Sequence, residues 1–80
     1  MQNSMKDIVR LILNEIVDDK DGLNIEEKIG TNSSAISIMT NHDDTGKIIG
    51  KSGNTIKALR SVIRAIGAKK NVRCNLYVID

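Results

Sequence analysis

Residues 50–53, which read Gly-Lys-Ser-Gly, are the part of the chain whose residue types and spacing best suit ligand binding. Gly50 and Gly53 carry no Cβ and can adopt positive φ, so the backbone can turn sharply there and approach another molecule closely. If a helix opens at Gly53, its first amides have no intrahelical acceptor and face outward, where the helix dipole favours an anion. Lys51 adds a positive charge. The segment therefore predicts a site for an anionic group, and a phosphodiester backbone suits it best.

Cationic residues flank this loop and would extend its positive field. One of them, Lys47, lies three residues before Gly50. Three more recur at spacings of three and four, which would align them along one stripe of a helix: Lys57, Arg60 and Arg64. Contact between this stripe and an anionic ligand, and a merely solvated helix face, are equally open interpretations.

Apolar residues on both sides of the loop could form the edge of a groove for bases. They are Ile48, Ile49 and Ile56, and part of each must also pack in the core. Tyr77 is the only aromatic residue of the chain and is distant from the loop in sequence, so base stacking on an aromatic platform is not expected. We therefore expect modest discrimination between nucleotide sequences.

The charges are divided unequally between the two parts of the chain. Residues 1–44 contain four Lys or Arg and nine Asp or Glu, a balance of −5, whereas residues 45–80 contain eight Lys or Arg and one acid, a balance of +7. This asymmetry predicts a basic surface, built by the second part, that faces an anionic partner. A dipolar surface without a function fits the charges alone equally well.

The hydrophobic periodicity indicates which elements position these residues. The expected elements are a helix over 5–17, strands over 23–29 and 35–40, a polar loop over 41–45, a short helix over 46–49, a helix over 53–67 and a strand over 72–79. Ser4 can cap the first helix, and Gly67 can end the last one. The buried stripe of the last helix is expected to be Ile56, Leu59, Ile63 and Ile66. The inward-facing residues of the last strand are expected to be Val72, Cys74, Leu76 and Val78.

These elements predict an α+β fold in one domain over residues 1–80, in which residues 1–4 form a disordered tail. The first two strands are joined by a short turn and should pair antiparallel. The last two are joined through helices and should therefore be parallel, with a right-handed crossover. The result is a three-stranded mixed sheet with three helices packed on one face.

The run from Ile48 to Ile56 resembles the signature of KH domains, in which two aliphatic residues precede a GxxG loop and an isoleucine follows it. The predicted element order resembles the type II KH topology over nearly the whole chain, from Met5 to Asp80. The runs over 43–51 and 79–80 are similar to those of the small bacterial KH proteins of the KhpA (YlqC) family.

This resemblance implies that the GxxG loop grips the backbone of about four nucleotides of single-stranded RNA. It also implies a post-transcriptional regulator or RNA chaperone linked to cell elongation and division, which forms a homodimer and pairs with a larger KH-containing protein of the KhpB type. The residues expected to bind RNA are Lys47, Ile48, Ile49, Gly50, Lys51, Ser52, Gly53, Asn54, Ile56, Lys57, Arg60 and Arg64.

Two other functions fit parts of the same pattern. Residues 46–52 superficially match a nucleotide-binding P-loop, but only three residues separate the two glycines where four are required, and Thr45 stands where the first glycine should be. A dimerising interaction module with little RNA binding of its own is the main alternative. The presence of both loop glycines together with Lys51 and Ser52 argues against it.

Catalytic, metal and cofactor functions have little support, and we expect no enzyme. His42 is the only histidine and stands in the polar loop without a nucleophile or metal partner in sequence, so a solvated loop residue is the better interpretation. Cys74 alternates with apolar neighbours and is expected in the core. Three aspartates, Asp18, Asp19 and Asp21, do not complete an EF-hand pattern.

No apolar run approaches the ~20 residues that span a bilayer. The N-terminal residues do not form a signal peptide, and the single cysteine allows no intrachain disulfide. We therefore expect a cytoplasmic protein.

Overall fold

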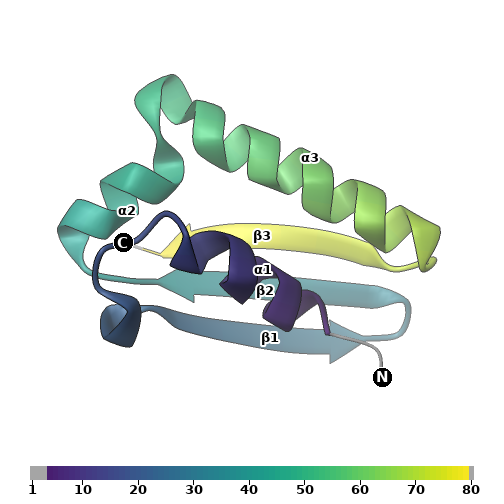
Figure 1. Ribbon diagram of the computed structural model, residues 1–80. Coiled ribbons are helices and arrows are strands. Elements are labelled where there is room, and N and C mark those ends of the chain that lie inside the picture. Colours follow the sequence, from purple (N-terminus) through teal and green to yellow (C-terminus); the bar gives the residue numbers. More distant parts are fainter. Residues whose placement is uncertain (1–3, 80) are drawn as a thin grey trace.

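The computed structural model describes residues 4–79 (Figure 1). The described elements are α1 (Met5–Asn14), the 3-10 turn η1 (Lys20–Gly22), β1 (Asn24–Gly30), β2 (Ser33–Met39), α2 (His42–Ile49), the 3-10 turn η2 (Lys51–Gly53), α3 (Asn54–Lys69) and β3 (Arg73–Ile79). The two 3-10 turns aside, the order helix–strand–strand–helix–helix–strand is the predicted one.

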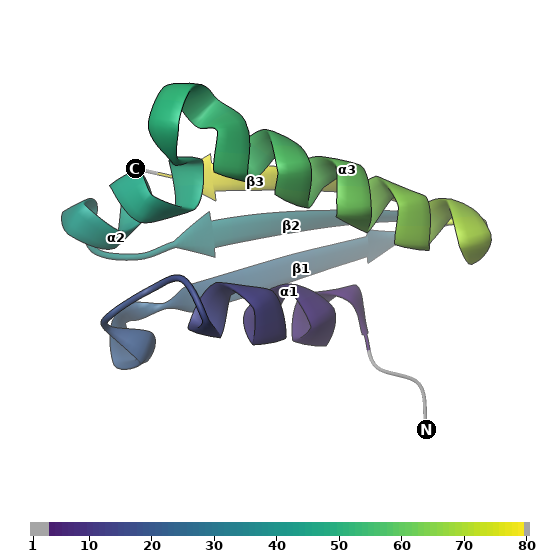
Figure 2. The same cartoon turned by 45° about the horizontal axis from the view of Figure 1, so that its top comes forward.

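The three strands form one mixed sheet in the order β1-β2-β3. β1 and β2 are antiparallel, with Asn24 opposite Met39, and β2 and β3 are parallel, with Ser33 opposite Arg73. Figures 1 and 2 show the helices on the same side of the sheet, with α1 near β1 and α3 near β3. This arrangement confirms the predicted α+β fold and both predicted strand pairings.

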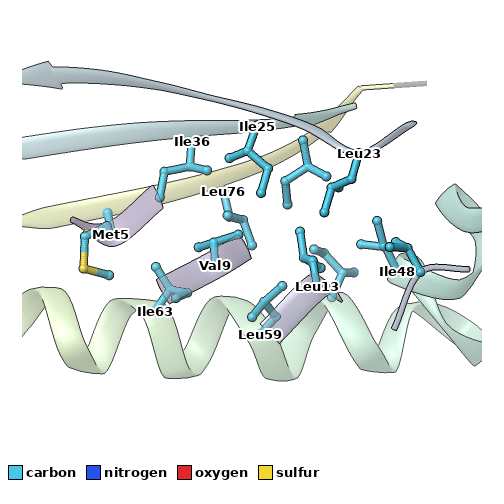
Figure 3. Packing of buried hydrophobic residues seen from close by; sticks show 14 residues of the cluster. Met5, Val9, Leu13, Leu23, Ile25, Ile36, Ile48, Leu59, Ile63 and Leu76 are labelled. Carbon is cyan, nitrogen blue, oxygen red and sulfur yellow. The ribbon is translucent and has the colours of Figure 1, made fainter. Parts of the chain in front are cut away.

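The core lies between the sheet and the helices (Figure 3). α1 buries Met5, Val9 and Leu13. The buried stripe of α3 is the predicted one, with Ile56, Leu59 and Ile63 enclosed and Ile66 packed partly against them. On β3, Cys74 and Leu76 are buried and Val72 and Val78 pack against the same core, so the predicted alternation is also confirmed. These contacts fix α3, and with it the loop at its start, against the sheet.

The structure corrects the predicted polar loop over 41–45. Asn41 is the N-cap of α2, and its Oδ1 accepts a hydrogen bond of 2.9 Å from the backbone amide of Asp44. Residues 42–45 are therefore the first turn of α2, where the positive end of the helix dipole stabilises acidic side chains. Polar composition alone does not separate such a capped first turn from a loop.

The predicted end of the last helix at Gly67 is also wrong, because α3 continues to Lys69. Gly67 lies buried inside the helix, and a Cβ on it would come within 2.5 Å of the Val72 carbonyl oxygen and 2.8 Å of the Cys74 sulfur. A glycine is thus needed here for close packing of α3 on the start of β3. The chain reverses at Asn71 instead, which has a left-handed backbone with φ 59°.

At the other end of the chain, Ser4 caps α1 as predicted, its Oγ accepting a hydrogen bond of 3.1 Å from the amide of Asp7. Ser4 is therefore part of the folded domain, not of the predicted tail; residues 1–3 lie outside the described residues. α1 ends at Asn14, earlier than the predicted Val17. The chain turns there, with the amide of Ile16 bonded to the carbonyl of Leu13, and Val17 is still buried.

Candidate nucleic-acid interface

The loop of residues 50–53 separates α2 from α3 by a sharp change of backbone direction. Gly50 has φ 75° and ψ 176°, Ser52 has φ 56°, and Gly53 has φ 75° and ψ 13°. The amide of Gly53 donates to the Gly50 carbonyl over 3.1 Å and closes the turn. Three positive φ angles among four residues hold the loop in one conformation that an ordinary helix could not adopt.

The two glycines are needed for different reasons. A Cβ on Gly50 would lie 2.2 Å from the Thr55 hydroxyl oxygen, so both its φ angle and the space around it exclude a side chain. A Cβ on Gly53 would have no heavy atom of the chain within 4 Å. The backbone at Gly53 therefore borders open space, where a ligand can come close to it.

The start of α3 lies open to this space. Gly53 is the N-cap residue of α3 and makes no side-chain capping bond to its first amides. Lys51, Ser52 and Asn54 are exposed around it. The amide of Asn54, the first of α3, donates to the Lys51 carbonyl, while the N-terminus of α3 and Lys51 border the open space, where the helix dipole favours an anionic group.

The predicted cations fall into two groups in the structure. Lys57 and Arg64 are exposed on α3. Arg60 is half-buried, and its Nε donates a hydrogen bond of 3.2 Å to the Leu76 carbonyl of β3. Lys47 forms ion pairs with Asp18 and, at 3.6 Å, with Asp44; the hydrogen bond to Asp18 is the main cause that raises the pKa of Lys47. Arg60 and Lys47 thus have contacts within the protein that brace α3 and α2.

The apolar residues near the loop are also divided. Ile48 is completely enclosed in the core and Ile56 is 6% exposed, whereas Ile49 is 38% exposed beside Gly50. Ile49 is therefore the one of the three with substantial apolar surface outside the core. The predicted contacts of all these residues with RNA stay predictions.

Asp44 joins the first turn of α2 to the segment that follows α1, and the sequence analysis did not single it out. Its side chain is almost fully buried and accepts hydrogen bonds from the amides of Asp18 at 3.1 Å and Asp19 at 3.0 Å. These two bonds are the main causes that lower the pKa of Asp44. The spacing of Asn41 and Asp44 is that of an N-cap and an N3 acid, a capping-box signal that could have revealed the helix start.

The other polar residues considered in the sequence do not form a metal site in the described part of the chain. Within residues 4–79, no group of three or more His, Cys, Asp or Glu side chains could hold a metal ion. Cys74 is buried, as predicted, and burial raises the pKa of its thiol. In the same part of the chain, none of the helices has the length and apolar character required to cross a membrane.

Comparison with known proteins gives results consistent with this fold. Residues 6–78 match the family model described as KhpA/KhpB, KH domain. The RNA-binding protein KhpA of Halalkalibacterium halodurans is 41% identical over 76 residues, which cover 95% of this chain and 100% of the relative. The proteins of the same name from Aquifex aeolicus and Chlamydia caviae are 36% and 34% identical, covering 98% and 95% of this chain and 99% and 97% of themselves.

Proposed function

Because the chain belongs to the KhpA/KhpB family of KH domains, we propose that it binds single-stranded RNA through the loop of residues 50–53. The single observation that carries this proposal is the open space next to the Gly53 backbone, at the N-terminus of α3 and beside the exposed Lys51. The names of the relatives describe RNA binding and agree with the expectation that the chain is not an enzyme.

The proposed mechanism is a grip on the sugar-phosphate backbone. Phosphate oxygens approach the positive end of the α3 dipole and pair with Lys51, while Lys57 and Arg64 extend the positive field along the helix. The exposed part of Ile49 gives one base an apolar contact. Since the only aromatic residue of the chain, Tyr77, belongs to β3 and not to the loop or the two helices that flank it, binding should depend little on base identity.

In the cell, this activity would belong to a cytoplasmic post-transcriptional regulator or RNA chaperone linked to cell elongation and division. The resemblance of residues 43–51 to the KhpA family supports this part of the proposal. A protein that binds RNA backbones broadly suits either role, because such a role requires many targets.

Self-association is a second candidate function, and an apolar cleft between α1 and α3 favours it. The cleft has a volume of about 240 Å³ and is lined by Ile12, Ile16, Thr55, Ala58, Leu59 and Val62. Leu11 and Val62 are 64% and 49% exposed. A second copy, or a larger KhpB-type protein, would cover this apolar surface. Two copies would also increase avidity for longer RNA.

The double variant Lys51→Asp/Ser52→Asp tests the RNA proposal. Two carboxylates would stand where phosphates approach, so RNA binding should be lost in a fluorescence-anisotropy titration, while circular dichroism should show an unchanged fold because both residues are exposed. Unchanged affinity in the folded variant would refute the grip by this loop. For self-association, Val62→Lys should shift the protein to monomer in sedimentation equilibrium, and Ile29→Lys, at an exposed isoleucine of β1 outside the cleft, should not.

A further inference from the structure

A hollow of about 500 Å³ lies between the C-terminal half of α3 and the beginning of β3. Its volume is within the usual range of small-ligand pockets. The lining residues that bear on its function are Arg64, Ala68, Asn71, Val72, Arg73 and Asn75. Arg64 stands 11 residues after Gly53 along α3, a distance of about 16 Å at 1.5 Å per residue. The hollow is therefore at the opposite end of α3 from the GxxG loop, where Figure 1 shows α3 turning into β3.

The chemistry of the hollow suits a nucleotide. Its lining contains two guanidinium groups, from Arg64 and Arg73, and no carboxylate. A guanidinium can hold a phosphate through two parallel hydrogen bonds. The side-chain amide groups of Asn71 and Asn75 offer hydrogen-bond donors and acceptors, which match the edges of an unstacked base. Ala68 and the half-buried Val72 provide apolar surface next to these groups.

The backbone that carries these side chains is fixed by hydrogen bonds. The amide of Arg73 donates to the Asn32 carbonyl over 2.9 Å, and the amide of Val72 donates to the Gly67 carbonyl over 2.8 Å. Asn71 holds the left-handed conformation that reverses the chain. A second hollow, lined by Thr31, Asn32 and Ser33, also reaches Asn71 and Arg73. The Arg73 side chain thus lies between two surface hollows at a rigid corner of the fold.

We propose that this hollow binds one further nucleotide of the RNA strand that the GxxG loop holds, with its phosphate between Arg64 and Arg73. The inference rests on the proposed function, because the ligand is the same strand. It adds Asn71, Arg73 and Asn75 to the residues that contact RNA. The domain would then hold more nucleotides than the four or so that a GxxG loop clamps.

Two single-stranded RNAs of the same mixed composition, one of about four nucleotides and one of about twelve, separate the two sites. Arg73→Gln should weaken binding of the longer RNA about tenfold and leave the shorter one unchanged, because only the longer strand reaches both sites. Asn71→Gly should also weaken binding of the longer RNA only, since glycine keeps the left-handed backbone and the change removes only the side-chain amide group. Lys28→Gln is the matched control: it removes one positive charge from β1, at the opposite edge of the sheet.

The outcomes distinguish this inference from the proposed function. If Lys51→Asp/Ser52→Asp abolishes binding of both RNAs while Arg73→Gln and Asn71→Gly change neither, the loop grip stands and the second site is refuted. If Arg73→Gln weakens both RNAs equally, or no more than Lys28→Gln does, the effect is one of general charge and the inference also fails. Sedimentation of the complex with the longer RNA must show one protein per RNA. If the longer RNA binds more tightly only when two copies of the protein are bound, the inference is overturned. If the wild-type protein binds neither RNA, the proposed function itself fails.

Discussion

The carboxylate of Asp44 accepts a hydrogen bond of 3.1 Å from the backbone amide of Asp18, which joins α2 to the segment that follows α1. The next amide, that of Asp19, donates to the other carboxylate oxygen over 3.0 Å. Lys47, one turn further along α2, pairs with the side chain of Asp18. The helix that leads into the GxxG loop is therefore anchored at a site remote in sequence, and the loop has a fixed base.

Replacing Asp44 should destabilise the protein more than replacing its neighbour Asp43. Asp44→Ala leaves two backbone amides and Asn41 without their acceptor, whereas Asp43 is exposed in the same helical turn. We expect a clear drop of Tm for Asp44→Ala, a smaller drop for Asp44→Asn, which keeps one oxygen, and little change for Asp43→Asn. Equal effects of Asp44→Ala and Asp43→Asn in thermal denaturation would contradict this role.

The same residue should make stability depend on pH in the acid range. The amides of Asp18 and Asp19 hold the pKa of Asp44 below its ordinary value of 3.8. A lowered folded-state pKa contributes stability at pH values above the unfolded-state pKa, and this contribution is lost as pH falls through the folded-state pKa. The difference in Tm between wild type and Asp44→Asn should therefore be constant near neutral pH and shrink below about pH 4. A difference that grows on acidification would contradict the assignment.

The sequence predicted the fold well where periodic apolar residues decide the structure. The stripe of Ile56, Leu59 and Ile63 and the alternation of β3 depend on local spacing, which a sequence displays directly. The errors arose where contacts distant in sequence decide. In the sequence, Gly67 looks like the end of a helix, and only the packing of α3 on the start of β3 shows why a glycine stands inside the helix. The burial of Asp44 likewise depends on hydrogen bonds from backbone amides 25 and 26 residues away.

The candidate site shows the same division. The loop glycines were predictable because their spacing and flanking residues are local. The ion pair of Lys47 with Asp18 and the hydrogen bond from Arg60 to the Leu76 carbonyl join residues distant in sequence, so they could not be predicted without the tertiary fold. So does the corner where Asn71 and Arg73 line one hollow, because it joins the end of a helix to the start of a strand.

The two loop glycines should respond differently to alanine. Gly50→Ala combines a backbone region accessible almost only to glycine with a Cβ 2.2 Å from the Thr55 hydroxyl, so we expect a loss of about 3 kcal/mol or more in the free energy of unfolding. Gly53→Ala should cost only about 1 kcal/mol, because the left-handed backbone is strained but the space is open. Urea denaturation measures both changes.

Gly53→Ala should nevertheless weaken RNA binding, because its methyl group occupies the space through which a phosphate approaches the backbone. We expect a loss of about tenfold, equivalent to ~1.4 kcal/mol. Gly46→Ala on α2 is a suitable control, since its methyl group also meets open space but stands one helical turn before Gly50 and outside the loop of residues 50–53. Wild-type affinity in Gly53→Ala would show that RNA does not approach the backbone at this residue.

Binding should weaken as salt concentration rises. If about four cations meet phosphates, the slope of log affinity against log salt should be roughly −3 for a single strand. Lys57→Gln/Arg64→Gln should make this slope shallower by about 1.4. These two residues are exposed, so the double variant should stay folded, whereas a change at Arg60 would also remove its bond to β3. A slope near zero in the wild type, or no change in the double variant, would argue against backbone contacts along α3.

Gly46 and Gly67, both inside helices, should respond to alanine with opposite signs. Alanine is favoured over glycine in a helix by up to ~1 kcal/mol. Gly46→Ala should therefore raise the free energy of unfolding, because its Cβ would have no atom within 4 Å. Gly67→Ala should lower it by about 1–3 kcal/mol, since the Val72 carbonyl and the Cys74 sulfur are too close and the overpacking outweighs the helix propensity. Urea denaturation of the two variants side by side tests this directly. Stabilisation by both would show that Gly67 marks no close contact between α3 and β3.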